Sequence, residues 1–296
     1  MLKKNKKDRK EQMAGYLFVA PFLIILIIFV IWPIVFSGYI SFFKWDLISN
    51  KTFVGAGNYA FLFTDPYFKK AIINTFILCI TSTVPQLLFA LGIAYFLNQK
   101  FVRGREVMKM SVFIPYLTST VAVALVFGSI FGNQYGVLNF LLNKVGLGAV
   151  NWAGTQIGTY IALSIMIIWR WTGYNSIIYL SAMQGVSHDL LEAATIDGAG
   201  KLQQFIFVII PQIKKILLFT VITGTIGGMQ IFTEPLLFNG TSGGEMRQGL
   251  TVSLLLYEEA FSRSQFGYAC AIAWVLFLII VLLSLMNSVM TSKIKE

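Results

Sequence analysis

Residues 16–36 read YLFVAPFLIILIIFVIWPIVF, an apolar run without a single charge. A helix needs about 20 largely apolar residues to cross the hydrocarbon core of a bilayer. The basic stretch MLKKNKKDRK at residues 1–10 precedes the run, as it would in a signal peptide. However, the apolar region of a signal peptide has only about 7–15 residues, and no small-residue cleavage site follows here. The run therefore predicts a membrane span that the protein retains.

The composition extends this conclusion to the whole chain. Of the 296 residues, 56% are hydrophobic and only 12% are charged, whereas soluble domains average about 25% charged residues. So few charges exclude an ordinary cytosolic enzyme, a disordered chain and a fibrous repeat. The net charge of +10 could indicate nucleic acid, an anionic membrane or a topology signal, depending on where the charges lie.

Six segments are long and apolar enough to be spans. The predicted fold class is therefore all-α, a polytopic membrane protein with six transmembrane helices. The segments are residues 14–38, 71–97, 110–131, 157–181, 215–238 and 266–290.

The Lys and Arg residues between these segments predict the orientation, because cytoplasmic loops are enriched in them. Six lie in the N-terminal tail, four between spans 2 and 3, three between spans 4 and 5, and two at the C-terminus. The opposite side carries seven, and Arg170 lies inside span 4. Both termini are predicted to be cytoplasmic, so the net charge is largely a topology signal and no nucleic-acid partner is expected.

Metal and disulfide chemistry are not expected. The two cysteines, Cys79 and Cys270, lie in apolar runs, and His188 is the only histidine. A structural zinc site needs about four ligands. No metal site is predicted, and both cysteines are interpreted as packing residues.

Prolines and small residues interrupt several spans. Pairs of glycines four residues apart, Gly128 with Gly132 and Gly224 with Gly228, allow helices to approach closely. Ordinary bundle packing explains these features, and so does a bundle whose helices must rock against each other.

The linker between spans 4 and 5 is unusual. Residues 187–215 read SHDLLEAATIDGAGKLQQFIFVIIPQIKK. Ser187 is a plausible N-cap for a short helix over residues 189–197, and Gly198 is a plausible end. Such a helix on the cytoplasmic surface, with small residues exposed, suits docking into a partner's groove. The alternative is an interfacial helix on lipid, although its acidic residues disfavour an anionic leaflet.

This linker resembles the EAA loop of ABC importer permeases. That pattern is EAA, three residues, Gly, nine residues and then I-x-L-P, and here it reads Glu192-Ala193-Ala194, Gly198 and Val208-x-Ile210-Pro211. Asp197-Gly198-Ala199 is similar to the carbohydrate branch, the maltose and glycerol-3-phosphate type. Further similarities, which extend the resemblance over about residues 14–290, are Phe53-Val54-Gly55, Asn58-Tyr59, Asp65-Pro66, Ile114-Pro115-Tyr116, Tyr257 and Ala260-Phe261.

The resemblance implies a type I ABC importer transmembrane domain over residues 14–290, with an EAA coupling loop at 182–214 and cytoplasmic tails at 1–13 and 291–296. It further implies a second permease subunit, so that a heterodimer is expected. Two ATPase subunits, an extracytoplasmic sugar-binding protein and membrane lipid complete the expected partners. The implied location is the bacterial plasma (inner) membrane.

In such permeases the EAA helix seats in a cleft of the ATPase, whose closure rocks the spans between inward-facing and outward-facing states. The residues that the resemblance assigns to ATPase coupling are Glu192, Ala193, Ala194, Asp197, Gly198 and Pro211. This chain has no phosphate-binding P-loop, because Gly200-Lys201 lacks the following Ser or Thr. No enzymatic activity and no cofactor are therefore expected here, and ATP and Mg²⁺ are expected on the partner ATPase.

Polar residues inside a span are candidates for a substrate site, because burying them is costly. Arg170 and Tyr174 in span 4 share a helix face. Alternatively, Trp171 and Tyr174 form an interfacial belt and Arg170 snorkels to it. Matching to maltose-type permeases implies a sugar site at Tyr116, Thr120, Arg170, Trp171, Tyr174, Gly224 and Gly228, of which the two glycines depart from the family's polar type. Gln230 and Glu234 could belong to a gate or be solvated.

Four other functions are weighed against this one. An unpaired Arg170 would suit an anionic sugar, and the same architecture serves permeases for non-sugar cargo. A secondary transporter would need paired acidic residues inside spans, and no acid here is interpreted as lying deep in a span, since Asp and Glu cluster in loops. An intramembrane enzyme would need a His/Ser or paired-Asp arrangement, which the sequence does not suggest.

Overall fold

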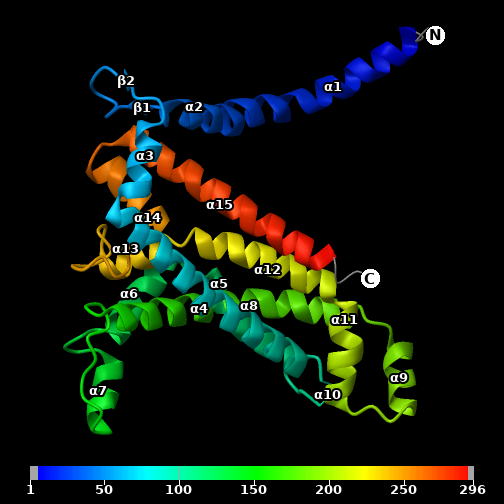
Figure 1. Cartoon of the computed structure of the whole chain (residues 1–296). Helices are drawn as coiled ribbons and strands as arrows, with labels where there is room; N and C mark the ends of the chain where they lie inside the picture. The colour runs from blue at the N-terminus through cyan, green and yellow to red at the C-terminus, as the bar shows by residue number, and fades with distance from the viewer. Residues whose placement is uncertain (1–5, 100, 293–296) are drawn as a thin grey trace. The chain divides into compact units, whose positions relative to one another are not determined.

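The computed structural model describes residues 6–99 and 101–292, and nearly all of its regular structure is helical (Figure 1). The all-α class is therefore confirmed, and it follows from the constraint that a chain in lipid must satisfy its own backbone polar groups. The predicted tails at 1–13 and 291–296 lie partly outside the described residues. Contacts divide the chain into two units, one with residues up to 64 and 259–274, the other with 65–258 and the residues from 275.

The first unit contains a short antiparallel strand pair in which Phe43 faces Phe53. The Trp274 indole donates a hydrogen bond to Ser37 Oγ at 3.2 Å. A Cβ at Gly38 would lie 3.0 Å from the same indole ring, so this glycine permits the contact. The elements are α1 (Lys6–Leu26), the π-helix η1 (Ile27–Ile31), α2 (Trp32–Ile40), β1 (Phe43–Lys44), β2 (Thr52–Phe53) and α3 (Gly57–Thr64).

The second unit holds the helices that form the candidate sites. Figure 1 shows α8 between α7 at one of its ends and α9 at the other. The elements are α4 (Pro66–Leu97), α5 (Arg105–Leu117), α6 (Thr120–Ile130), α7 (Val137–Lys144), α8 (Gln156–Gln184), α9 (His188–Ile196), α10 (Lys201–Gln204), the π-helix η2 (Phe205–Ile209), α11 (Ile210–Gln212), α12 (Lys214–Met229), α13 (Thr233–Asn239) and α14 (Val252–Tyr257). The π-helix η3 (Glu258–Ser262) begins at the boundary, and α15 (Phe266–Ser292) runs from the first unit into the second.

The count of six spans is not confirmed. Among the described residues, four segments are long and apolar enough to cross a membrane, namely Gly15–Ile40, Pro66–Leu97, Lys214–Asn239 and Phe266–Val289. The predicted third span is two helices, α5 and α6, which are bent by 93° at Thr118–Ser119 and count as a fifth span only if taken together. Pro115 near the end of α5 contributes to this break. The predicted fourth span is α8, whose 29 residues suffice in length but which is not among the apolar segments.

Helix α8 packs closely against α4 and α5. An added Cβ at Gly173 would overlap the backbone carbonyl of Val112 in α5. On the α4 side, Thr81 Oγ1 and Ser164 Oγ are joined by a 2.8 Å hydrogen bond. A small residue at position 173 is thus required for the two helix backbones to meet.

The glycine pairs differ from each other. Gly224 and Gly228 of α12 do face α4, because a Cβ would lie 2.9 Å from Thr83 at the first and 2.6 Å from the sulfur of Cys79 at the second. At Gly128, in contrast, nothing lies within 4 Å of an added Cβ. The predicted close helix approach is therefore confirmed for the pair in α12, whereas no described part of this chain uses it at Gly128.

One amide ties the start of α4 to α8 and to the loop before α14. Asn74 Nδ2 donates to the carbonyls of Arg247 and Leu250 at 3.1 and 2.9 Å. Its Oδ1 accepts from Gln156 Nε2 at 3.1 Å and from Tyr160 Oη at 2.7 Å. The amide of this buried residue is therefore fully used.

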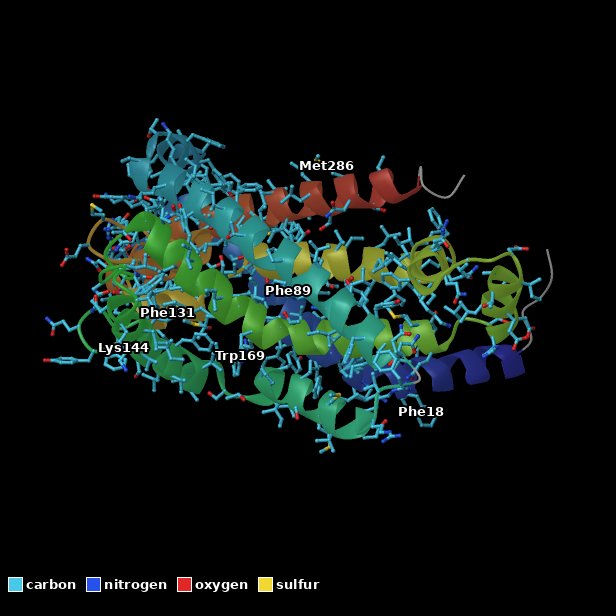
Figure 2. The ribbon with its side chains drawn as sticks, turned by 90° about the horizontal axis from the view of Figure 1, so that it is seen from below. Phe18, Phe89, Phe131, Lys144, Trp169 and Met286 are labelled. Atoms are coloured by element: carbon cyan, nitrogen blue, oxygen red, sulfur yellow. The ribbon has the colours of Figure 1, made fainter. Side chains whose placement is uncertain are left out.

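Aromatic packing builds the end of this unit that holds α6 and α7. Phe131 is buried and its ring lies 5.2 Å from that of Trp152. Figure 2 shows Phe131 and Lys144 at this end, with Trp169 further along α8. The cluster closes one end of the helices whose middle carries the candidate substrate site.

We predict that Gly173→Ala destabilises the protein by about 1–3 kcal/mol, because the added methyl forces α5 and α8 apart. Thermal unfolding in detergent measures the change. The matched control is Gly92→Ala in α4, where an added Cβ has open space. Equal unfolding temperatures for the two variants would contradict the close-packing explanation.

Candidate functional site

The predicted helix in the 187–215 linker is present as α9. It spans His188–Ile196, and the side chain of Ser187 accepts a hydrogen bond from the Asp189 N–H at 3.3 Å. The acidic Asp189 in the first turn is favourable there because the N-terminus of a helix carries partial positive charge. The N-cap assignment is therefore confirmed, and the boundaries agree to within one residue.

A left-handed glycine ends α9. Gly198 has φ +84°, and the Ala199 N–H donates to the carbonyl of Ala194 at 2.9 Å. This arrangement is a glycine C-cap, which satisfies carbonyls at the end of the helix. Nothing lies within 4 Å of an added Cβ at Gly198, so the backbone conformation, and not space, requires glycine.

A buried glutamine holds the turn after α9 in place. Gln204 is 5% exposed, and its Nε2 donates to Thr195 Oγ1 and to the carbonyl of Ala199, both at 2.9 Å. Leu191 of α9 packs on a hydrophobic cluster that contains Ala94 of α4 and Tyr179 of α8. The loop is thus anchored on its inner side to the helices behind it.

The outer side of α9 is open. Glu192 is largely exposed, and its carboxylate lies 3.1 Å from His188 Nδ1, one turn earlier. Ala193 and Gly198 are exposed and Ala194 is half-buried. Of the remaining residues predicted for coupling, Asp197 is the C-cap residue of α9 and Pro211 is the second residue of α11, and both are exposed. The structure therefore presents a small, flat surface beside acidic side chains.

A cavity of about 440 Å³ lies between α4, α5, α8, α12 and α13. It is within the size range of small-molecule sites. One wall is aromatic, since the ring of Tyr116 stacks on Tyr174 at 4.6 Å and lies edge-on to Trp171 at 5.3 Å. Such a wall offers flat apolar faces, and amides and hydroxyls supply hydrogen-bonding groups elsewhere in the lining.

Two charged side chains line the same cavity. Arg170 of α8 and Glu234 of α13 approach to 3.7 Å between Nη1 and Oε1. Glu234 is 7% exposed and lies within the apolar segment Lys214–Asn239. Glu234 is thus buried near the end of this segment, where the fifth predicted span placed it, and Arg170 is not an unpaired cation.

The cavity brings together six of the seven residues predicted for substrate binding. They are Tyr116, Arg170, Trp171, Tyr174, Gly224 and Gly228. Thr120, in the first turn of α6, is not among the residues that line the cavity. The bend between α5 and α6 explains why Tyr116 lines the cavity and Thr120 does not, because the two residues lie on helices that run in different directions.

Sequence reasoning missed several polar residues of the lining. Gln86 is 5% exposed and Asn175 is 6% exposed, and both line the cavity with Thr83 and Thr223. Gln86 and Asn175 are amides inside predicted spans, so the rule that polar groups are costly in lipid would have found them. Thr83 and Thr223 give no such signal, since a helical Thr can bond to its own backbone.

Comparisons with known proteins identify the family. Residues 73–295 match the family described as binding-protein-dependent transport system inner membrane component. The probable ABC transporter permease protein YurN of Bacillus subtilis is 36% identical over 282 residues, which cover 94% of this chain and 96% of that protein. The lactose transport system permease protein LacF of Rhizobium radiobacter is 35% identical over 287 residues, 96% of each chain.

A solved structure has the same fold. It is that of a bacterial ABC transporter involved in the import of the acidic polysaccharide alginate, with a TM-score of 0.86 over 98% of this chain and 99% of that one. The sequence identity is 22%, so this likeness supports the fold.

We predict that Gln204→Ala loosens the turn after α9, because the carbonyl of Ala199 then loses a buried hydrogen bond, at a cost of about 1–3 kcal/mol. Hydrogen–deuterium exchange over residues 193–200 measures the effect, and roughly tenfold faster exchange is expected. The control is Gln212→Ala, at an exposed position. Unchanged exchange in the Gln204 variant would show that the anchor does not hold the loop.

Proposed function

The chain belongs to the family of binding-protein-dependent transport system inner membrane components, and from this premise we propose that it is the membrane-spanning subunit of an ATP-driven sugar importer. The observation that carries the proposal is the exposed surface of α9, which Gly198 ends and Gln204 anchors. A helix that is anchored on one side and offers small residues on the other suits a partner's cleft.

The coupling role belongs to Glu192, Ala193, Ala194, Asp197, Gly198 and Pro211. In this proposal two ATPase subunits bind ATP and Mg²⁺, and their closure moves α9. The chain itself hydrolyses nothing and holds no cofactor. A second permease subunit completes the pore, and an extracytoplasmic binding protein delivers the cargo, as the family description implies.

The sugar assignment has two supports. One relative is a lactose transport system permease. In addition, the aromatic wall of Tyr116, Trp171 and Tyr174 fits the apolar faces of a pyranose ring, while the lining amides and hydroxyls fit its hydroxyl groups. Cargo other than sugar would have less use for a stacked aromatic wall.

The proposed topology has six spans in the bacterial plasma (inner) membrane, with α8 as the fourth and both termini in the cytoplasm. Among the described helices, α8 is long enough to span but is not among the segments apolar enough by composition, and its Arg170, Tyr174 and Asn175 side chains line the cavity. Facing a cavity is how a membrane helix accommodates such groups. With this topology α9 lies in the cytoplasm, where an ATPase can reach it.

We predict that Gly198→Asp uncouples the importer. The variant places a charged side chain on the surface where the ATPase would seat and imposes a positive φ on a non-glycine residue. In proteoliposomes of the purified complex, ATP-dependent sugar uptake should fall by more than about tenfold, while ATP hydrolysis continues.

The matched control is Gly200→Ala, because Gly200 has a negative φ and its nearest neighbour allows a Cβ. This variant should transport normally. Normal uptake by the Gly198→Asp complex, or a chain that purifies without any ATPase subunit, would count against the proposed function.

We also predict that Tyr116→Ala weakens sugar transport, since it removes the ring that stacks on Tyr174. The KM for the sugar should rise by roughly 3–10-fold, in keeping with about 0.5–1.5 kcal/mol for an aromatic contact. Thr120→Ala is the control because Thr120 lies outside the cavity lining. An equal rise in KM for both variants would show that the cavity is not the sugar site.

A further inference from the structure

The charges of the cavity cancel. Among the described residues that line it, Arg170 and Glu234 carry the only formal charges, one positive and one negative. Their side chains are 19% and 9% exposed and approach to 3.7 Å. Because they come from α8 and α13, the folded structure is needed to bring them together.

The pairing leaves both groups able to bond to cargo. At 3.7 Å the contact is an ion pair and is too long for a hydrogen bond. Moreover, Arg170 Nε is buried and has no hydrogen-bond partner within the described chain. A buried N–H of this kind is costly unless something completes it. Nε itself is shielded from the cavity, but the partly exposed guanidinium keeps other N–H donors for cargo, beside a carboxylate with acceptor capacity.

These properties distinguish between kinds of cargo. An anionic group that approached Arg170 would also approach the Glu234 carboxylate, and like charges repel strongly where water is scarce. A hydroxyl group both donates and accepts, so it can bond to Glu234 and to Arg170 without adding charge. Neighbouring hydroxyls on a sugar ring would satisfy both side chains at once.

We propose that Glu234 determines specificity by cancelling the charge of Arg170, so that the cavity takes uncharged polyhydroxy cargo and rejects acidic sugars and sugar phosphates. The proposal rests on the proposed importer function for its cargo, but the charge of the cavity can be measured independently. The burial of Glu234 excludes the alternative that it is solvated.

The test measures the electrostatic potential in the cavity with two thiol reagents of opposite charge. In a chain carrying Cys79→Ala and Cys270→Ala, Thr223→Cys places one thiol in the cavity lining. The rates of modification by anionic methanethiosulfonate ethylsulfonate and cationic methanethiosulfonate ethyltrimethylammonium are measured on the full-length chain in membrane vesicles. Their ratio reports the local potential, and the rate with uncharged methyl methanethiosulfonate checks that each variant remains accessible and folded.

Four versions of the cavity are compared. With Arg170 and Glu234 both present, the anionic-to-cationic ratio should match that of the double variant Arg170→Gln/Glu234→Gln. Glu234→Gln alone should raise the ratio by about tenfold, and Arg170→Gln alone should lower it by about tenfold. As a control, the thiol is placed instead at Ser181→Cys, which is exposed and about three turns beyond Arg170 in α8. There the anionic-to-cationic ratio should be the same in all four versions.

If the unmodified pair already gives the ratio of Glu234→Gln, the cavity is cationic and the proposal is wrong. Uptake by the assembled importer provides a second arm, with lactose and its aldonic acid lactobionate as a neutral and anionic pair. Equal uptake of the two by the unmodified importer would also overturn the proposal. Absence of uptake of any sugar, together with the expected thiol ratios, would instead reject the sugar function and leave the neutral cavity standing.

Discussion

The close approach of α8 to α5 and α4 is the constraint on which the candidate substrate site depends. The contact requires glycine at position 173, where a side chain would meet the Val112 carbonyl. Arg170, Trp171 and Tyr174 lie within one turn of this contact, so the packing that brings the backbones together also aims these side chains. Tyr116 of α5 can stack on Tyr174 only because the two helices touch. A wider spacing between α5 and α8 would separate Tyr116 from Tyr174, even if every helix still formed.

The parts of the structure that follow from short-range chemistry could be predicted from sequence. Ser187 at the start of α9 and Gly198 at its end are cap signals that act within a few residues. The apolar runs that form α4 and α12 each predict a single helix from contiguous residues. For the same reason the aromatic side of the cavity was largely foreseeable, since Trp171 and Tyr174 belong to one helix.

Contacts between distant segments could not be predicted in this way. Arg170 and Glu234 are 64 positions apart, and the ion pair exists only because the fold brings α13 next to α8. The 93° bend between α5 and α6 separates Thr120 from Tyr116, although the two are only four residues apart. Conversely, Gly128 carries the signal of a close-packed glycine, but no atom of the described chain lies within 4 Å of an added Cβ there. One sequence pattern is compatible with either outcome until the surroundings are known.

The π-helix η2 changes how the number of residues in the EAA-type loop sets the rotation of α9 relative to α12. An α-helix turns about 100° per residue, so a change of one residue between α9 and α12 would ordinarily rotate one relative to the other by that angle. A π-turn encloses one residue more than an α-turn, and η2 at Phe205–Ile209 absorbs it between Gly198 and Pro211. The number of residues between Gly198 and Pro211 therefore does not by itself determine the rotation angle between α9 and α12. A chain one residue shorter here could present the same face of α9 to a partner and the same face of α12 to the cavity.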